Sequence, residues 1–332
     1  MLSYIGFRVL QVIPLLFAIS VIVFIIIQLP PGDFLTSYVD QLKLSGNDVD
    51  ESMIMNLTSQ YALDKPLYMQ YFIWMKNILL HADFGTSFQY KMPVSAVIGE
   101  RLLLTMAISF ISMVVIWLIA IPIGIYSSTH PYSPMDYAFS LIGFIGLAIP
   151  GFLIALILIY TVYSQTGVAI TGLSSPAYAE APWSMAKVWD MVPRMIIPVV
   201  IIGLSGTAGL IRVTRGMMLD ELSKQYVTTA RAKGLSERKL LWKYPVRTAV
   251  NPLISTVGWT LPTLISGEAI VSIVLNLPTT GPILLNALMV QDMYLAGSFI
   301  LILSVLTVLG TLLSDILLAV LDPRIRYGGA SA

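Results

Sequence analysis

The sequence predicts an all-α integral membrane protein with six transmembrane helices, an external loop subdomain and a protruding basic helical segment. Three observations predict this fold class. The 332 residues are 57% hydrophobic and only 11% charged, with a mean hydropathy of +0.83, which is too apolar for the charged surface of a soluble domain of this length. Six apolar runs are long enough to cross a bilayer. The basic residues gather between two of these runs.

The first apolar run covers residues 9–29 and stops at the helix-breaking sequence Pro30-Pro31-Gly32. It is longer than the apolar part of a signal peptide, and no small-residue cleavage site follows it, so we interpret it as a retained transmembrane helix. The other predicted spans are residues 102–126, 137–163, 196–211, 249–275 and 295–321.

The distribution of Lys and Arg predicts the orientation. Residues 212–247 carry nine of the 19 basic residues, whereas residues 30–100 carry four, against eight acidic ones. The positive-inside rule then places the basic loop and both termini in the cytoplasm and residues 30–100 outside. Although the turn 127–136 would also be cytoplasmic, it contains no Lys or Arg. The predicted regions are 1–29 (N-terminus and first span), 30–100 (external loop subdomain), 101–321 (five-helix transmembrane domain, with the basic loop at about 212–247) and 322–332 (cytoplasmic tail).

One helical pattern stands out in the external loop. Pro66-Leu67-Tyr68 opens the pattern, which runs through Leu80. Its aromatic residues are Tyr68, Tyr71, Phe72 and Trp74. This composition predicts an amphipathic helix that lies at a membrane interface.

The basic loop contains the stretch YVTTARAKGLSERKLLWKYPVRTAVNPL, from Tyr226 to Leu253. Apolar residues recur at helical spacing at Leu222, Tyr226, Val227 and Ala230. Gly234 is expected to end that helix, because glycine readily adopts the positive φ that a helix C-terminus requires.

A second short helix is predicted after this glycine. Ser236 is placed to cap it, Leu235 and Leu240 have the spacing of a hydrophobic staple, and Pro245 limits its length. The result is a rigid helix–elbow–helix. It is either a solvated positive loop or a docking element for a soluble partner. The continuous apolar side and the fixed capping favour the docking element.

Several motifs, in this order and spacing, together resemble the first permease subunit of the oligopeptide/dipeptide permease family of bacterial ABC importers. The segment 228–234 (TTARAKG) resembles the permease loop EAA-x₃-G. The segments 63–67 (LDKPL) and 83–87 (DFGTS) resemble external-loop signatures of the family, and 321–326 (LDPRIR) resembles its C-terminal signature. The resemblance covers nearly the whole chain.

The chain departs from the family pattern in places that bear on its cargo. Thr228 and Thr229 stand where the motif has Glu and its first Ala. Residues 277–281 (LPTTG) replace the usual LPGLG, and Ser272 stands where Glu is typical, with Glu268 four residues earlier. The cargo is therefore open between peptides and oligosaccharides.

The resemblance implies a membrane permease of the bacterial inner membrane, multi-pass, with N- and C-termini cytoplasmic. Its partners would be a second permease subunit, forming a heterodimer, two ABC ATPase subunits, a solute-binding protein outside and the lipid bilayer, with no nucleic acid. Because the chain has no G-x-x-x-x-G-K-[ST] phosphate loop, ATP and Mg would be bound by the ATPases. The chain itself would then be neither an enzyme nor the holder of a cofactor.

The resemblance also assigns residues to roles. The elbow would be a cytoplasmic coupling helix seated in a cleft of the ATPase. The residues expected to carry ATPase coupling are Thr229, Ala230, Arg231, Ala232, Lys233, Gly234 and Leu235.

Three acidic or polar residues of the later predicted spans each have a candidate role. Glu268, with Ser272, is a possible residue of the translocation path, because an ionisable group in a span faces a cavity or a partner. Pairing with the sister subunit is the alternative for Glu268. Asp315 has the same ambiguity and lies close enough along the chain to pair with Arg324.

Two rival functions come from other classes. A secondary transporter would show paired half-repeats, and we find no duplication. An intramembrane protease would need a base near Ser205, whose surroundings (Gly203, Gly206, Gly209) instead predict close helix packing. The only histidines lie in or beside loops, and neither cysteine nor an H-E-x-x-H motif offers a metal route.

Overall fold

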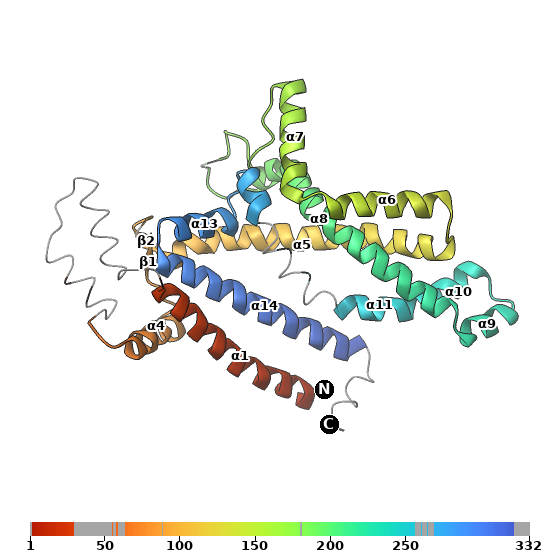
Figure 1. Cartoon of the computed structure of the whole chain (residues 1–332), viewed down its shortest axis with the longest axis horizontal. Helices are drawn as coiled ribbons and strands as arrows, with labels where there is room; N and C mark the ends of the chain where they lie inside the picture. Colours follow the sequence, from red (N-terminus) through yellow and green to blue (C-terminus); the bar gives the residue numbers. More distant parts are fainter. Residues whose placement is uncertain are drawn as a thin grey trace. The chain divides into compact units, whose positions relative to one another are not determined.

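The computed structural model describes residues 2–29, 55, 58, 64–87, 89–179, 181–255, 260, 264 and 269–321. Figure 1 shows the chain as helices with a single short β pair in the described part. The chain divides into two compact units. The first unit comprises Met1–Arg8, Thr105–Pro278 and Leu309–Ala332, and the second comprises Val9–Leu104 and Thr279–Val308. The predicted all-α membrane class is confirmed.

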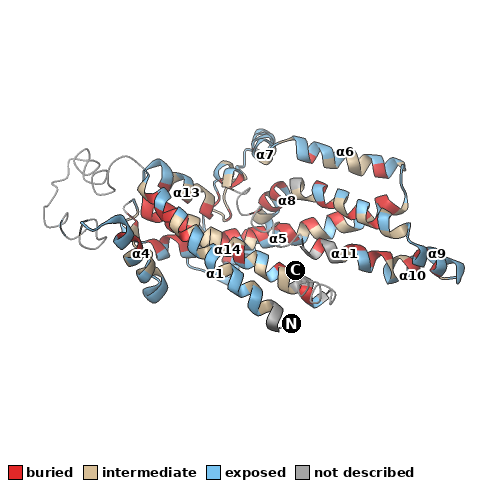
Figure 2. Ribbon diagram, turned by 60° about the horizontal axis from the view of Figure 1, so that its bottom comes forward, coloured by how far each residue is buried: buried red, intermediate tan, exposed pale blue. Residues whose placement is uncertain are grey.

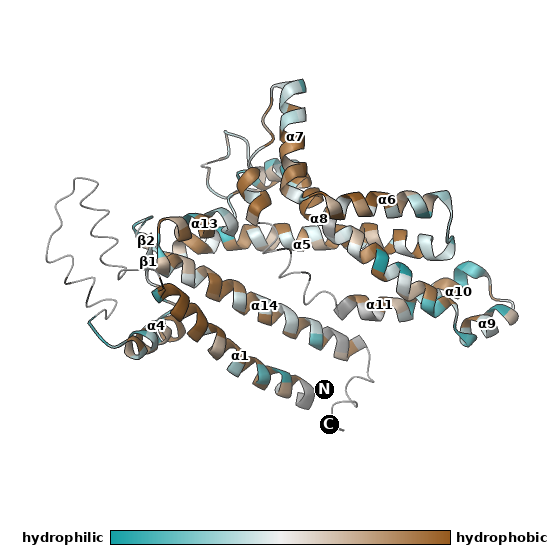
Figure 3. Ribbon diagram, viewed as in Figure 1, coloured by the Kyte–Doolittle hydropathy of each residue, from teal (hydrophilic) through white to brown (hydrophobic). Residues whose placement is uncertain are grey.

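Three helices are long and apolar enough to cross a membrane: α1 (Leu2–Gln28), α5 (Val94–Thr129) and α14 (Met293–Leu321). Figure 3 shows their hydrophobic residues along most of each helix. Two further spans pass the same test as bent pairs, so the described residues contain up to five spans. Much of the predicted span 249–275 lies outside the described residues, which hold its beginning in α11 (Pro245–Ser255).

The predicted continuous span 137–163 is wrong in one respect, because the chain turns by 96° within it. Helix α6 (Pro134–Ala148) ends at Ile149, which has extended backbone angles, and α7 (Gly151–Thr166) follows Pro150. A proline disfavours helical angles at the preceding residue, so the break has a local cause.

Helix α8 (Met185–Leu222) is longer than its predicted span. It has 38 residues against the 16 of the interval 196–211, and it bends by 51° between Leu204 and Gly206. At about 1.5 Å per residue, a helix of this length exceeds the thickness of the hydrocarbon layer, so it extends beyond it.

In the second unit, α4 (Leu67–His81) confirms the helix predicted in the external loop. It packs on α1 and α14 through an apolar cluster. A second cluster joins the start of α5 to α13 (Thr280–Met289) and α14. Between α4 and α5, β1 (Thr86–Ser87) pairs with β2 (Met92–Pro93) in antiparallel register.

The DFGTS segment is fastened to the beginning of α14 by a buried carboxylate. Ser87 Oγ donates to Asp292 Oδ2 at 2.6 Å, and the Gln89 N–H donates to the same oxygen at 3.2 Å. The other oxygen, Asp292 Oδ1, accepts the Leu295 N–H at 3.3 Å, which caps the first turn of α14. Gly85, directly before β1, has a φ of +92°.

In the first unit, α6 packs on α8 and α5 closely approaches α8, and Figure 2 shows buried residues along α5 and α8. The predicted small-residue face of α8 is confirmed at two of its three glycines. A Cβ at Gly203 or Gly206 would lie 3.3 or 3.0 Å from the Ile116 side chain of α5, whereas a Cβ at Gly209 would meet nothing within 4 Å.

Gly124 of α5 lies still closer to α8, and the sequence patterns did not indicate it. A Cβ there would lie 2.6 Å from Thr214 Cβ and 3.1 Å from the Ile211 carbonyl oxygen. We expect Gly124→Ala to push the helices apart and to lower the free energy of unfolding by about 1–3 kcal/mol. Thermal unfolding in detergent measures this. Gly209→Ala is the matched control and should leave the melting temperature unchanged. Equal melting temperatures for the two variants would contradict the close approach.

Candidate functional site

The elbow predicted in the basic loop is present as two short helices. Helix α9 (Gln225–Ala232) and α10 (Glu237–Lys243) are joined through Gly234 at φ +78°. The Gly234 N–H donates to the Arg231 carbonyl at 3.0 Å, and the Leu235 N–H donates to the Ala230 carbonyl at 3.4 Å. This bonding pattern is the Schellman motif, which requires a left-handed residue at the position of the glycine. The predicted helix end is confirmed.

A small apolar core holds the two helices at a fixed angle. Val227, Ala230 and Leu240 are buried, and Leu235 and Tyr244 pack against them. Leu235 and Leu240 therefore form the predicted staple. The next helix, α11, begins at Pro245, as expected for a proline at a first helical position. The apolar side of the element is continuous across the elbow.

Two details of the predicted elbow differ. Ser236 occupies the N-cap position of α10, but its side chain makes no capping hydrogen bond. Leu222 does not continue the apolar face of α9, because α8 ends at Leu222 and α9 begins at Gln225. Leu222 packs instead beside Met218 and Val246, in the cluster that joins α8 to α11.

An ion pair closes the solvent side of the elbow. Arg231 Nε donates to Glu237 Oε1 at 2.6 Å, and Nη2 donates to Oε2 at 3.1 Å. The hydrogen bonds from Arg231 lower the pKa of the Glu237 carboxyl below its ordinary value, and the same bonds raise the pKa of Arg231. Both side chains are at least half exposed. This bidentate pair therefore orients Arg231 more than it stabilises the fold.

The base of the elbow is tied to α8. The Tyr226 hydroxyl donates to the Glu221 carboxylate, and the Tyr226 ring lies 6.1 Å from that of Tyr244. Desolvation first, and the Glu221 carboxylate second, raise the pKa of Tyr226. Because α9 and α10 have their own core and α11 packs on α8, a force on the elbow reaches α8 through packed side chains.

The seven residues predicted for coupling are brought together but do not share one environment. Thr229, Arg231, Ala232, Lys233 and Gly234 are exposed around the turn. Leu235 is half-buried, and Ala230 is 6% exposed in the core of the elbow. In this structure Ala230 supports the surface rather than forming part of it.

An ion pair with a buried carboxylate lies at the turn 127–136, which contains no Lys or Arg of its own. Arg215 of α8 donates to Asp136 Oδ1 at 3.1 Å and to Oδ2 at 2.9 Å. Asp136 also accepts the Tyr132 N–H, and its own N–H is capped by Ser133 Oγ. Arg215 thus brings a basic group to this turn. Sequence reasoning did not find the pair, because the partners are 79 residues apart.

Asp315 is paired, but with a different partner from the one suggested by the sequence. Its Oδ2 lies 3.2 Å from Arg8 Nη1. Arg324, the partner suggested by the sequence, lies outside the described residues. The pair joins the beginning of α1 to the end of α14.

Of the two residues predicted for the translocation path, the structure describes only one. Glu268 lies outside the described residues. Ser272 is fully buried in the first unit, and its carbonyl accepts the Leu277 N–H at 2.8 Å. The Ser272 side chain is therefore covered by other described residues of the chain.

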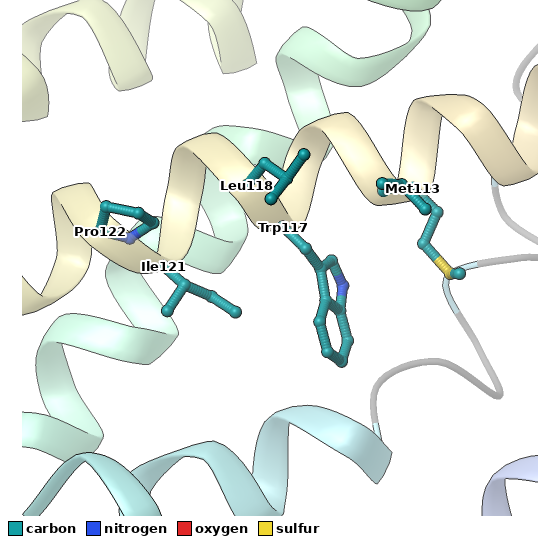
Figure 4. Close-up of a pocket in the computed structure, with 6 residues that line it drawn as sticks. Met113, Trp117, Leu118, Ile121 and Pro122 are labelled. Carbon is teal, nitrogen blue, oxygen red and sulfur yellow. The ribbon is translucent and has the colours of Figure 1, made fainter. Parts of the chain in front are cut away.

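Figure 4 shows an apolar pocket on α5, about 410 Å³ in volume, with Trp117 and Ile121 projecting from the same side of the helix. Met113, Val114, Leu118 and Pro122 complete it. The Trp117 indole N–H is buried and has no hydrogen-bond acceptor among the described residues. Such a lining suits another apolar surface rather than an ion. None of the predicted site residues lines this pocket.

Known proteins match this chain over its full length. The family model described as "Binding-protein-dependent transport system inner membrane component" matches residues 120–327, and its N-terminal companion, "Binding-prot-dependent transport system membrane comp, N-term", matches residues 1–109. The chain is 36% identical to the oligopeptide transport system permease protein AppB of Bacillus subtilis, across 98% of this chain and 100% of AppB. It is 29% identical to the glutathione transport system permease protein GsiC of Escherichia coli, across 98% of this chain and 100% of GsiC.

A solved structure shares the fold. The methionine ABC transporter MetNI, in inward-facing conformations, contains a chain that superposes with a TM-score of 0.50 at 18% identity. The match covers 68% of this chain and 96% of the other.

Proposed function

This chain belongs to the family of binding-protein-dependent transport system inner membrane components, and from that membership we propose that it carries peptides, as half of the translocation pathway of an ABC importer. The cargo proposal rests on the similarity to permeases named for oligopeptides and for glutathione, a small peptide. An oligosaccharide importer is the alternative that the altered LPTTG segment keeps open.

The elbow formed by α9 and α10 carries the proposed mechanism. Its capped turn, its own core and its link to α8 make a rigid projection of the kind that transmits motion. We assign Thr229, Arg231, Ala232, Lys233 and Gly234 to the surface that contacts an ATPase, and Ala230 and Leu235 to its support. Closure of the ATPases would displace the elbow and, with it, α8.

The partner set follows from the family. A permease of this kind works with an ATPase that binds ATP and Mg and with a solute-binding protein. We propose two ATPase subunits and a different second permease, each permease supplying one elbow. A heterodimer would give the path two unlike halves.

We propose that the elbow and both termini lie in the cytoplasm. Nine basic residues in 212–247 support this orientation through the positive-inside rule. The Arg8–Asp315 pair supports termini on one side, because it joins the beginning of the first span to the end of the last. The regions 1–29, 30–100, 101–321 and 322–332 remain the proposed division along the membrane.

For the path itself, we propose Glu268 as a lining residue, because an acidic group within a predicted span is costly unless it faces water or a partner. Ser272 lies one helical turn further along the chain and is buried here. Its proposed role requires that the transport cycle expose it to the path.

The proposed cargo is tested by reconstituting the permease with its sister permease, ATPases and binding protein in liposomes. We expect ATP hydrolysis to rise when the binding protein is loaded from a peptide pool and to stay basal with an oligosaccharide pool. Stimulation by oligosaccharides alone would overturn the peptide assignment. Uptake by this chain alone, driven by an ion gradient, would overturn the ATP-driven mechanism.

A further inference from the structure

Helix α4 has two apolar faces, and only one of them is packed. On the packed face, Tyr71 and Trp74 are buried against α1, where the Phe24 ring lies 5.5 Å from the ring of Tyr71 and 5.8 Å from that of Trp74. The Tyr71 hydroxyl shares a 2.8 Å hydrogen bond with Ser20 Oγ. This face is fixed to the first span.

The second face is open. Tyr68, Phe72, Leu79 and Leu80 are 64%, 63%, 74% and 68% exposed. Their positions, with those of the packed residues, make α4 apolar around most of its circumference. The helix contains no acidic residue, and Lys76 is its one lysine. An open apolar face of this kind marks a contact with a membrane or a protein.

The packed face shows the depth at which α4 lies. Ser20 precedes Gln28, the end of the candidate span Ile5–Gln28, by about 12 Å along the helix axis. Tyr71, bonded to Ser20, therefore lies beside a stretch of α1 that crosses the hydrocarbon layer. Gln70 Oε1, on the preceding residue, accepts a hydrogen bond from Gln28 Nε2 at 3.3 Å, so α4 lies near the end of this span and the Tyr71 side chain reaches deeper.

Exposed aromatic side chains of α1 and α4 both lie near the buried Tyr71 ring. Phe17 is 60% exposed on α1, and its ring lies 6.3 Å from that of Tyr71. The Tyr71 ring lies 5.6 Å from that of Phe72, on the open face. The outward side of α1, a span 24 residues long, must face apolar surroundings in the membrane. The open face of α4 continues that surface.

We propose that membrane lipid covers the open face of α4, so that this helix anchors the external segment to the bilayer beside the first span. Tyr68 and Phe72 lie among the acyl chains near the headgroups. Lys76, which lies on the open face between Phe72 and Leu80, extends its amine to the lipid phosphates. The assignment to the outer leaflet rests on the proposed orientation, whereas the lipid contact itself does not depend on it.

The chain has no cysteine, so single nitroxide labels can be placed without background. Phe72→Cys and Leu79→Cys report on the open face, and Asp64→Cys, exposed in the turn before α4, is the aqueous control. In the full complex in lipid vesicles, we expect labels 72 and 79 to be more accessible to oxygen than to a water-soluble nickel chelate. Label 64 should show the reverse.

Substrate-stimulated ATP hydrolysis is the control that each labelled complex is folded. If one of the variants Phe72→Cys and Leu79→Cys does not fold, the other still reports on the open face. Nickel accessibility at both positions, as at 64, would overturn the proposal. The proposal would also be overturned if labels 72 and 79 were shielded from the nickel chelate only after the solute-binding protein is added. The open face of α4 would then be a protein-docking surface. Reaction of Asp64→Cys with an impermeant thiol reagent from the inside alone would overturn the orientation and leave the lipid contact standing.

Discussion

Replacing Gly234 with arginine is expected to abolish transport while ATP hydrolysis continues. Gly234 has φ +78°, and its hydrogen bond closes the turn between α9 and α10. A non-glycine residue in this left-handed conformation costs about 1–2 kcal/mol. A Cβ there meets nothing within 4 Å, so Gly234→Arg creates no clash within the chain and projects a long cation from the proposed contact surface.

The matched control is Gly234→Asn, because asparagine tolerates the left-handed conformation and carries no charge. Both rates are measured in liposomes that contain the full complex. We expect import to fall by an order of magnitude or more in Gly234→Arg, and to stay near the wild-type rate in Gly234→Asn. Normal import by the arginine variant would refute the coupling role of the elbow. Equal losses in both variants would indicate a requirement for glycine flexibility instead.

Asp136→Asn is expected to destabilise the first unit strongly. In the unsubstituted chain, Arg215 makes two charge-assisted hydrogen bonds to Asp136. The substitution removes the negative charge that balances Arg215. The Asp136 side chain is only 5% exposed and that of Arg215 is 29% exposed. Breaking such a pair should cost about 3 kcal/mol, the low end for buried pairs because one partner reaches solvent.

Thermal unfolding in detergent measures this loss, and Glu237→Gln is the control. Glu237 is also in a bidentate pair, but both members of that pair are exposed, so the control should lose much less stability than Asp136→Asn. Adding Arg215→Met to Asp136→Asn should recover part of the stability, because the unpaired charge is then removed. A double variant less stable than Asp136→Asn would show that Arg215 stabilises the fold through packing rather than through the pair.

Local chemistry explains why the elbow was predictable from the sequence. Gly234, Leu235, Leu240 and Pro245 act on neighbours within a few residues, so their spacing alone specified a helix end, a staple and the start of the next helix. The break at Pro150 belongs to the same class. Its signal was present in the sequence, but the apolar run around it was interpreted as one span.

The close approaches could be predicted only in part. Small residues on α8 indicated that a helix would pack there, and Ile116 does pack on Gly203 and Gly206. The sequence could not show that a Cβ at Gly209 would meet nothing, or that one at Gly124 would lie closer to its neighbours than one at Gly203 or Gly206. Which glycine is used depends on the crossing point of two helices, and that point is set by all of their side chains together.

The sequence by itself determined that this chain is a multi-span membrane protein with a rigid basic elbow, because apolar length, charge asymmetry and turn chemistry act over short distances along the chain. Only the tertiary structure decided the pairs Asp136–Arg215, Arg8–Asp315 and Ser87–Asp292. Their partners are far apart in the sequence, and a buried charge can be satisfied by any suitable group that packing brings near. The same packing decided which face of α4 is closed and which is open.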